Sequence, residues 1–314
     1  MIQSRSSSAV VHCPVCGSQR KRRVAELPHV GTVLDCQECG VHYAQYDSPE
    51  NGGSAAPATT NDTDHFKGLD LDQYFRSVMQ TRLRSYRPLL ARLQPFVKAG
   101  KWLDIGCSYG WLLKFVAEQG FDAAGIEPSA AAAQEAVAKG LKMREGLFPS
   151  CLAPDEKFDV LSFMDVLEHL PSPIEALQSA AAHLNPGGIV VIQVPDQACF
   201  LYRLAVALNR YSGQRISFAL RRLWLVGFDF PHQFYFEKDS LDRVVRAAGL
   251  QVLDWYRSPI GSPLEALDRV QYADPSSRLK NLVVGTAVGA INAVDMLTQH
   301  GGLLTMLARK EPLA

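Results

Sequence analysis

The stretch 101–128 carries residues whose types and spacing suit a nucleotide cofactor. Gly106 and Gly110 frame a short turn between an apolar, strand-like run and a helical run. Glycine lacks a Cβ and lets backbone approach a ligand, and the start of the next helix offers unpaired N–H groups. Glu127 follows at about 20 residues, where a carboxylate can accept both hydroxyls of a ribose. The stretch therefore predicts a site for an adenosine-type cofactor.

Four cysteines near the N-terminus have the spacing of a zinc ribbon. Cys13 and Cys16 form one Cys-x-x-Cys-Gly motif, and Cys36 and Cys39 form a second after a gap of nineteen residues. Four thiolates complete a closed tetrahedron, which leaves no position for water and predicts structural Zn²⁺. Two disulfides or a redox dithiol remain the alternatives. The neighbouring His12 and His42 are expected at the surface.

Composition bounds the class of protein. The chain has 314 residues, 47% of them hydrophobic, with 32 basic and 32 acidic residues, so its overall charge attracts neither nucleic acid nor an anionic membrane. The first residues lack the apolar run of a signal peptide, and seven cysteines in this pattern fit a reducing compartment, so we expect the cytoplasm. The apolar stretch 282–297 is too short to span a bilayer and is expected as a buried or groove-covering helix.

The order of elements predicts a small module followed by a large α/β domain. Residues 1–46 are assigned to the ribbon, 47–69 to a linker, and 70–314 to the large domain, with a helical insertion at about 198–228. The expected helices cover 70–93, 130–139, 174–184, 240–248 and 281–297, and the expected later strands cover 158–164, 188–194, 250–256 and 303–307. The last strand is expected to pair antiparallel at the sheet edge.

Alternating strands and helices predict a parallel sheet with helices on both faces, and ligands of such sheets bind beyond the carboxyl ends of the strands. Asp104, Glu127 and Asp165 all fall at such ends. Four segments then carry a resemblance: Asp104-Ile-Gly-Cys-Ser-Tyr-Gly110, Gly125-Ile-Glu-Pro128, Phe158 through Leu170, and Leu184-Asn-Pro-Gly-Gly through Pro195. Together they resemble class I S-adenosylmethionine-dependent methyltransferases over roughly residues 71–250. The likeness is greatest to the group of ubiquinone-biosynthesis methyltransferases and bacterial zinc-ribbon-bearing small-molecule methyltransferases.

This resemblance implies a Rossmann-like seven-stranded methyltransferase sheet and a set of residues around S-adenosylmethionine. Asp104 and the turn would border the methionine part, Glu127 the ribose, and Phe148 the adenine, while Asp165 and Val166 would lie under the cofactor and Tyr74 would close over it. The implied set is Tyr74, Asp104, Gly106, Cys107, Ser108, Gly110, Glu127, Pro128, Phe148, Asp165 and Val166. Ser108 departs from the family pattern, which usually has glycine there.

Two histidines are candidates for a base at the methyl acceptor. His169 follows the fourth strand of the domain, and His232 precedes an aromatic, strand-like run. An imidazole with a pKa near ~6.5 can take a proton from a hydroxyl, although a structural role remains open for each. The insertion between them is expected to form a lid over the acceptor. Its arginines, Arg203, Arg210, Arg215, Arg221 and Arg222, could hold an anionic substrate, a membrane surface or a protein partner.

The leading hypothesis is transfer of a methyl group to a small or carrier-linked metabolite, with oxygen as the favoured acceptor atom. One alternative is an rRNA or tRNA methyltransferase that docks RNA through the ribbon and Arg20 to Arg23. The neutral charge and the lack of an Asn-Pro-Pro-Tyr-like tetrad at residues 165–168 count against nucleic acid. Another alternative is a non-catalytic cofactor-binding scaffold.

Overall fold

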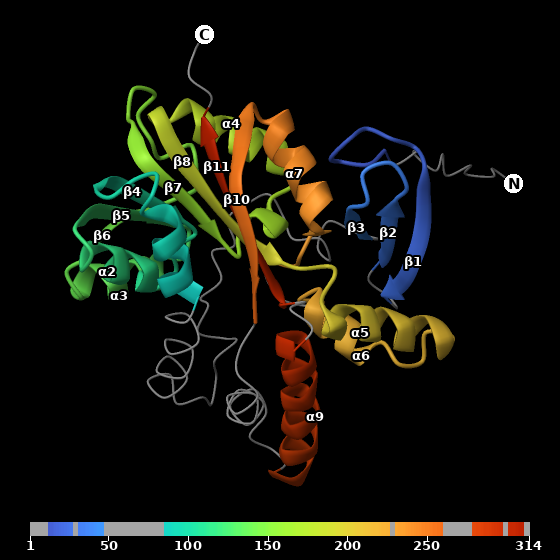
Figure 1. The fold of residues 1–314 in the computed structure, drawn as a ribbon. Helices are drawn as coiled ribbons and strands as arrows, with labels where there is room; N and C mark the ends of the chain where they lie inside the picture. Colours follow the sequence, from blue (N-terminus) through green and yellow to red (C-terminus); the bar gives the residue numbers. More distant parts are fainter. Residues whose placement is uncertain are drawn as a thin grey trace, which may run out of the picture.

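A computed structural model describes residues 12–27, 31–46, 85–226, 230–259, 278–297 and 301–310. Its centre is a seven-stranded sheet in the order β10-β11-β8-β7-β4-β5-β6 (Figure 1). The strands are β4 (Gly100–Ile105), β5 (Phe121–Glu127), β6 (Lys142–Glu145), β7 (Phe158–Met164), β8 (Leu184–Pro195), β10 (Leu250–Ser258) and β11 (Leu303–Lys310). From β6 to β8 all neighbours run parallel, while β11 is antiparallel to both β8 and β10. The predicted seven-stranded α/β sheet is confirmed.

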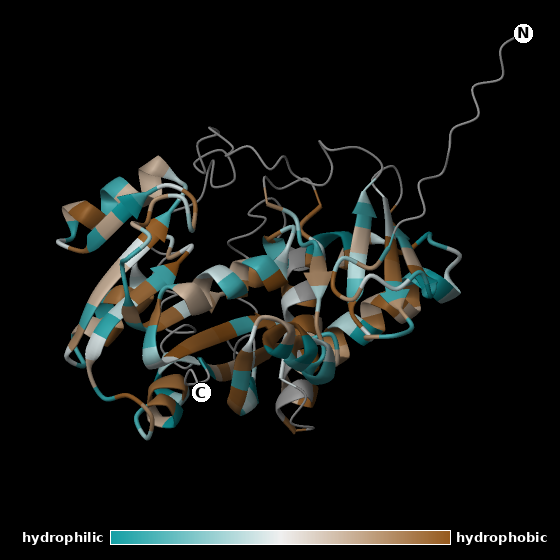
Figure 2. Ribbon diagram, turned by 90° about the horizontal axis from the view of Figure 1, so that it is seen from above, coloured by the Kyte–Doolittle hydropathy of each residue, from teal (hydrophilic) through white to brown (hydrophobic). Residues whose placement is uncertain are grey.

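Helices cover both faces because adjacent strand residues point to opposite sides. Leu103, Leu161 and Val190 pack in one cluster with residues of α4 (Pro173–Ala182) and α7 (Lys238–Ala247). Their sequence neighbours Trp102 and Val160 pack on the other face, with α2 (Trp111–Ala117) and the helix covering 85–93. The helix α3 (Ala130–Ala138) contacts β5 and β6. Figure 2 shows brown segments in the interior of the molecule and teal segments on many of the outer helices and loops.

The N-terminal ribbon is part of a second sheet rather than a separate unit. Strands β1 (Lys21–Leu27), β2 (Gly31–Cys36) and β3 (His42–Tyr46) form an antiparallel meander. The short strand β9 (Phe234–Tyr235), from the large domain, pairs antiparallel with β3 and completes a four-stranded sheet. Residues assigned to two domains on sequence therefore share one hydrogen-bonded sheet.

The insertion folds as two helices, α5 (Phe200–Tyr211) and α6 (Phe218–Leu223). Tyr202 and Trp224 are fully buried in a cluster that also holds Leu27 and Val33 of the ribbon, so the helices pack beneath the ribbon (Figure 1). The helix α9 (Arg278–Leu297) contacts α5. Within the described residues, no helix is both long enough and apolar enough to cross a bilayer.

Two sequence-based expectations need correction, and others fall outside the described residues. The last strand is antiparallel as predicted, but β11 lies between β8 and β10, so β10 forms the edge. His42 is half-buried instead of lying at the surface, because its Nδ1 is 2.8 Å from the hydroxyl of Tyr202. The segment 47–69, the first part of the 70–93 helix and Tyr74 lie outside the described residues.

Candidate functional site

The turn between β4 and α2 is closed by bonds to the neighbouring strand. The N–H groups of Gly106 and Cys107 donate to the carbonyl of Ile126, at 2.8 and 3.2 Å. Gly106 has a φ of +66°, and a Cβ built on it would lie 2.6 Å from Cγ2 of Val166. Both the backbone conformation and the space therefore require glycine at this position. Ser108 also has a left-handed φ of +48°. Glycine adopts this conformation most readily, which explains why the family pattern usually has glycine at this position.

Glu127 ends β5 directly beside this turn and is buried. One of its carboxylate oxygens accepts from the N–H of Ser108 at 2.8 Å, and the other accepts from the N–H of Ser129 at 2.9 Å. These two bonds fix the plane of the carboxylate. Since a carboxylate has about four acceptor positions, it can accept two ribose hydroxyls in addition to the two N–H groups. The arrangement fits the ribose role implied by the family resemblance.

Two further acids stand at strand ends and are oriented by side chains of the same sheet. Asp104, buried at the end of β4, accepts from the hydroxyl of Ser162 at 2.6 Å, and Ser162 accepts from the indole N–H of Trp102 at 2.8 Å. Asp165 follows β7 with a φ of +59°, and the amide of Gln193 lies 3.4 Å from its carboxylate. The sheet thus holds three carboxylates at the carboxyl ends of β4, β5 and β7.

The remaining cofactor candidates surround these acids. Pro128 follows Glu127 and is half-buried, and Phe148, which follows β6, contacts Phe163 edge to face at 5.7 Å between ring centroids. Cys107 is buried, and burial raises the pKa of its thiol, which disfavours the thiolate that a nucleophilic cysteine needs. Apart from Tyr74, whose position is not described, the candidates come from one continuous end of the sheet.

Both candidate histidines meet at a buried glutamate, Glu168, which is not among the site residues predicted from the sequence. The turn Leu167–His169 follows β7, and Glu168 within it is fully buried. Nε2 of His169 and Nε2 of His232 lie 3.9 and 4.0 Å from Oε1 of Glu168. The two imidazole rings are 4.7 Å apart between centroids. The position of Glu168 between an apolar residue, Leu167, and a histidine is the sequence feature that could have indicated a functional role. Acidic side chains are rarely buried unless they pair with another group.

Burial sets the protonation of this histidine pair. Desolvation lowers the pKa of His169, and it lowers the pKa of His232 further below the usual range, aided by the neighbouring His169. Both imidazoles are therefore neutral at pH 7 and able to accept a proton. Nδ1 of His169 lies 3.3 Å from the carbonyl of Pro231, so Nδ1–H donates there and Nε2 is the acceptor. The ligand atoms of Glu168, His169 and His232 lie within 4.8 Å of one another, close enough to share a cation.

The histidine pair and the cofactor turn are joined through Val166. Its side chain lies against Gly106, and its carbonyl accepts from the N–H of His169 at 3.0 Å. His232 is held from the other side, because its own N–H donates to the carbonyl of Trp224 and its carbonyl accepts from the hydroxyl of Tyr46 at 2.6 Å. The insertion and the ribbon therefore both fix the position of His232.

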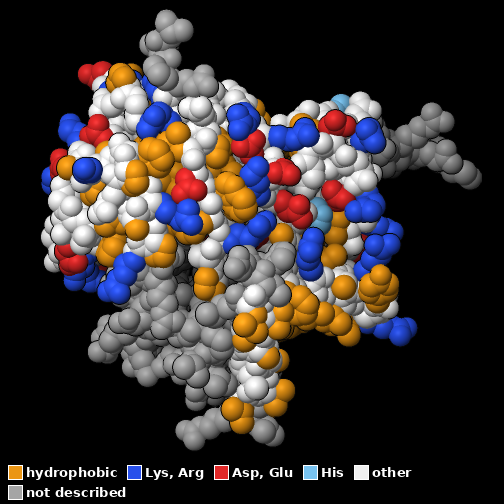
Figure 3. Space-filling model, in the orientation of Figure 1, with side chains coloured by type: hydrophobic (Ala, Val, Ile, Leu, Met, Phe, Trp, Pro, Cys, Tyr) orange, Lys and Arg blue, Asp and Glu red, His pale blue; other side chains and the backbone are white. Residues whose placement is uncertain are grey.

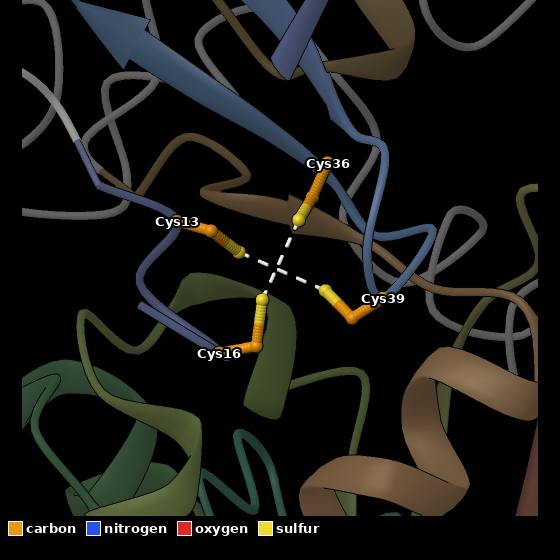
Figure 4. Close-up of side chains that lie close together, drawn as sticks. All are labelled: Cys13, Cys16, Cys36 and Cys39. Carbon is orange, nitrogen blue, oxygen red and sulfur yellow. Dashed lines mark hydrogen bonds between the residues drawn. The ribbon is translucent and has the colours of Figure 1, made fainter. Parts of the chain in front are cut away.

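The four ribbon cysteines point at a common centre (Figure 4). Their sulfur atoms lie within 4.8 Å of one another, with Cys13 and Cys39 at 3.7 Å and Cys16 and Cys36 at 3.5 Å. Zn–S bonds of about 2.3 Å in a tetrahedron place sulfurs about 3.8 Å apart, so the donor set fits Zn²⁺. The hydrogen bond between Cys13 and Cys39 lowers the pKa of Cys13 to about 5, which favours the thiolate form that Zn²⁺ binds.

The basic run of the ribbon is largely paired with acids. Arg20 lies 3.3 Å from Glu38, Arg22 lies 2.8 Å from Asp35, and the third pair joins Arg23 to Glu26 at 2.7 Å. These pairs reduce the positive field that phosphate binding would need. The described structure therefore gives no support to an RNA-docking ribbon edge.

Comparisons with known proteins agree on one family. A family model described as a methyltransferase domain matches residues 75–254. The ubiquinone biosynthesis O-methyltransferase of Haemophilus ducreyi is 35% identical over 124 residues, covering 35% of this chain and 52% of that protein. The protein of the same name from Aliivibrio fischeri strain MJ11 is 31% identical, covering 34% and 48%. The chain thus spans about half the length of these curated relatives.

Solved structures support the fold alone. A chain from the complex between the Haloferax volcanii Trm112 methyltransferase activator and the putative methyltransferase superposes with a TM-score of 0.54 at 16% identity. The match covers 80% of this chain and 99% of that one. At this level of identity the likeness carries no information on the substrate.

Proposed function

Because this chain belongs to the methyltransferase-domain family, we propose that it transfers the methyl group of S-adenosylmethionine to an oxygen atom of a small or carrier-linked metabolite. The observation that carries the proposal is Glu127, held by two backbone N–H groups beside the Gly106 turn. When bound, the sulfonium cofactor would supply an activated methyl group. The two relatives' printed names support oxygen as the acceptor atom, and the chain's partial coverage of them leaves the acceptor a proposal.

Cofactor binding can be tested by isothermal titration calorimetry with S-adenosylmethionine. We expect Glu127→Ala and Asp104→Ala to weaken binding at least tenfold, since each removes a carboxylate at a strand end facing the turn. Glu118→Ala is the matched control, because Glu118 is an exposed acid beyond the end of α2. Unchanged affinity in both site variants would refute the cofactor assignment.

For the acceptor, we propose His169 as the base and His232 as the residue that positions it. The acceptor hydroxyl forms a bond to the methyl carbon as the carbon–sulfur bond breaks, and Nε2 of His169 takes the hydroxyl proton. This assignment is supported by the neutral ring, the Nδ1–H bond to Pro231 and the greater exposure of His169, 18% against 9% for His232. Glu168 stabilises the imidazolium that forms.

A kinetic comparison of the two histidines tests these roles. His169→Ala should lower kcat by about 10²-fold or more while S-adenosylmethionine binds normally. His232→Gln should lower kcat less than His169→Ala does and leave S-adenosylmethionine binding unchanged, because it removes only the ring that packs 4.7 Å from His169 between centroids. If His169→Ala retains full activity with the natural acceptor, a hydroxyl-deprotonating role is wrong.

We further propose that Cys13, Cys16, Cys36 and Cys39 hold a structural Zn²⁺. The support is the tetrahedral spacing of four sulfurs and the absence of disulfides, since all seven cysteines are free. Free thiols also fit a cytoplasmic location. Metal analysis of the purified protein should give one zinc per chain, and Cys16→Ser should lower that content.

An RNA methyltransferase is the less supported alternative, because the ribbon arginines are paired with acids. A tight, salt-sensitive complex with ribosomal or transfer RNA would favour it over the metabolite proposal. A non-catalytic scaffold is the other alternative, and single-turnover methyl transfer to any component of a metabolite extract would exclude it.

A further inference from the structure

The outer surface of the insertion exposes apolar side chains that the fold does not use. The helix α5 packs Tyr202, Ala205 and Asn209 inward. On other faces of α5 and α6 and the turn between them, large apolar side chains point to solvent. We define the insertion face by five of them: Phe200 (41% exposed), Leu208 (40%), Tyr211 (85%), Ile216 (50%) and Phe218 (74%). Such a contiguous set is unusual on a surface without a partner.

The insertion face is also strongly basic. The segment 197–226 contains five arginines and no aspartate, glutamate or lysine, although the whole chain is neutral. Arg203, Arg210 and Arg215 are exposed, and within the described ranges none of these three forms an ion pair. The neighbouring α9 adds exposed Leu282 and Leu297. Figure 3 shows hydrophobic side chains gathered where Figure 1 places α5, α6 and α9, with Lys or Arg side chains nearby.

The position of the insertion face relates it to the cofactor site. The helix α5 follows the carboxyl end of β8, and α9 leads into the start of β11, which pairs with that same end through Leu303 and Pro195. The three strand-end acids lie at the carboxyl ends of β4, β5 and β7, which run parallel to β8. The insertion face and the cofactor site therefore share one end of the sheet.

We propose that the insertion face binds the surface of an anionic lipid bilayer, on which the protein lies without crossing it. Arginines can pair with lipid phosphates while the apolar side chains enter the boundary of the acyl chains. A second copy of this chain would bring arginines against arginines across a two-fold interface. A nucleic acid would offer phosphates but no apolar partner for Leu208 or Ile216. Of these three occupants, the bilayer matches both properties.

Sedimentation with phospholipid vesicles tests the proposal. The full chain should bind vesicles of phosphatidylcholine mixed with phosphatidylglycerol at low salt, and bind vesicles of phosphatidylcholine alone far more weakly. Each arginine near an anionic surface contributes about fivefold in partitioning, so Arg210→Gln with Arg215→Gln should weaken binding by about 25-fold. Tyr211→Ser with Phe218→Ser should also weaken it, and that loss should persist at high salt.

The matched control is Lys98→Gln with Lys101→Gln. It removes the same charge at exposed positions, at the beginning of β4 and the opposite end of the sheet. Its binding should match the unaltered protein within about twofold. Absence of binding to anionic vesicles at low salt would overturn the proposal, as would an equal loss in the control and arginine variants. Both readouts are independent of methyl transfer, so failure here leaves the catalytic proposal to its own test.

Discussion

The hydroxyl of Tyr46 provides a direct test of whether the ribbon positions the acceptor site. This hydroxyl donates to the carbonyl of His232 at 2.6 Å from a half-buried ring in β3. Tyr46→Phe keeps the ring and removes one hydrogen bond, which corresponds to about 0.5–1.5 kcal/mol of unfolding free energy, and more if the carbonyl finds no water. We expect kcat to fall by about three- to tenfold, because the segment carrying His232 loosens. Affinity for S-adenosylmethionine should be unchanged, since Tyr46 lies in the four-stranded sheet and the cofactor turn follows β4 of the seven-stranded sheet.

The same strand supplies the control for this substitution. Tyr43 is buried, and its hydroxyl has no hydrogen-bond partner among the described residues. Tyr43→Phe therefore makes the same chemical change and should leave stability equal or slightly higher, with kcat unaltered. Urea unfolding, steady-state kinetics and calorimetric titration would be measured on both variants. Equal effects of the two substitutions, or a loss of cofactor affinity in Tyr46→Phe, would refute the reasoning.

Three further predictions concern the turn, the metal and pH. Gly106→Ala should lower the unfolding free energy by about 1–3 kcal/mol, because the residue has a left-handed backbone and its new Cβ would approach Val166. Adding Val166→Ala should restore part of this stability, since it removes the clashing side chain. Strictly additive effects of the two substitutions in urea unfolding would contradict the clash. Cys39→Ser should lower the melting temperature and methyl transfer but not S-adenosylmethionine affinity, with Cys151→Ser, a change at a half-buried cysteine outside the ribbon, as the neutral control. Burial lowers the pKa of His42 to about 4 in the folded protein, against about 6.5 in the unfolded chain. Protonation of His42 therefore favours unfolding. The free energy of unfolding should be unaffected by this residue above pH 6.5 and should fall by up to about 3 kcal/mol as the pH falls toward 4. The pH dependence of unfolding should therefore be shallower in His42→Gln, and identical slopes would contradict it.

The sequence patterns predicted the elements whose residues interact locally. The strand 158–164 is predicted at its observed bounds, and the helix 130–139 differs by one residue at its end. Both depend on neighbouring residues, since the strand is one apolar run and the hydroxyl of Ser129 accepts from the N–H of Ala132 at the start of the helix. The pairing of β9 with β3 could not be foreseen. A two-residue strand has no periodicity, and its partner is encoded in another part of the chain. The interior position of β11 is likewise set by packing.

The candidate site was predictable in its parts but not in its assembly. The glycine turn and Glu127 are close in sequence, so their spacing carries the information. His169 and His232 were each identified alone, yet their shared contact with Glu168 depends on how the segment after the insertion folds back. Ser108 stands where the family pattern usually has glycine. Its left-handed φ shows that the backbone of the turn keeps a conformation that glycine would adopt, although the side chain differs.

The shared sheet of the ribbon and β9 also bears on how the chain is made. Tyr46 and the His232 carbonyl that it contacts are 186 residues apart in the sequence. At a synthesis rate of about 5–20 residues per second, the ribbon emerges roughly 10–40 seconds before its fourth strand exists. During this interval β3 presents an unpaired edge, because β9 is its partner in the finished sheet. The order of translation therefore makes the ribbon appear well before the segment that completes its sheet.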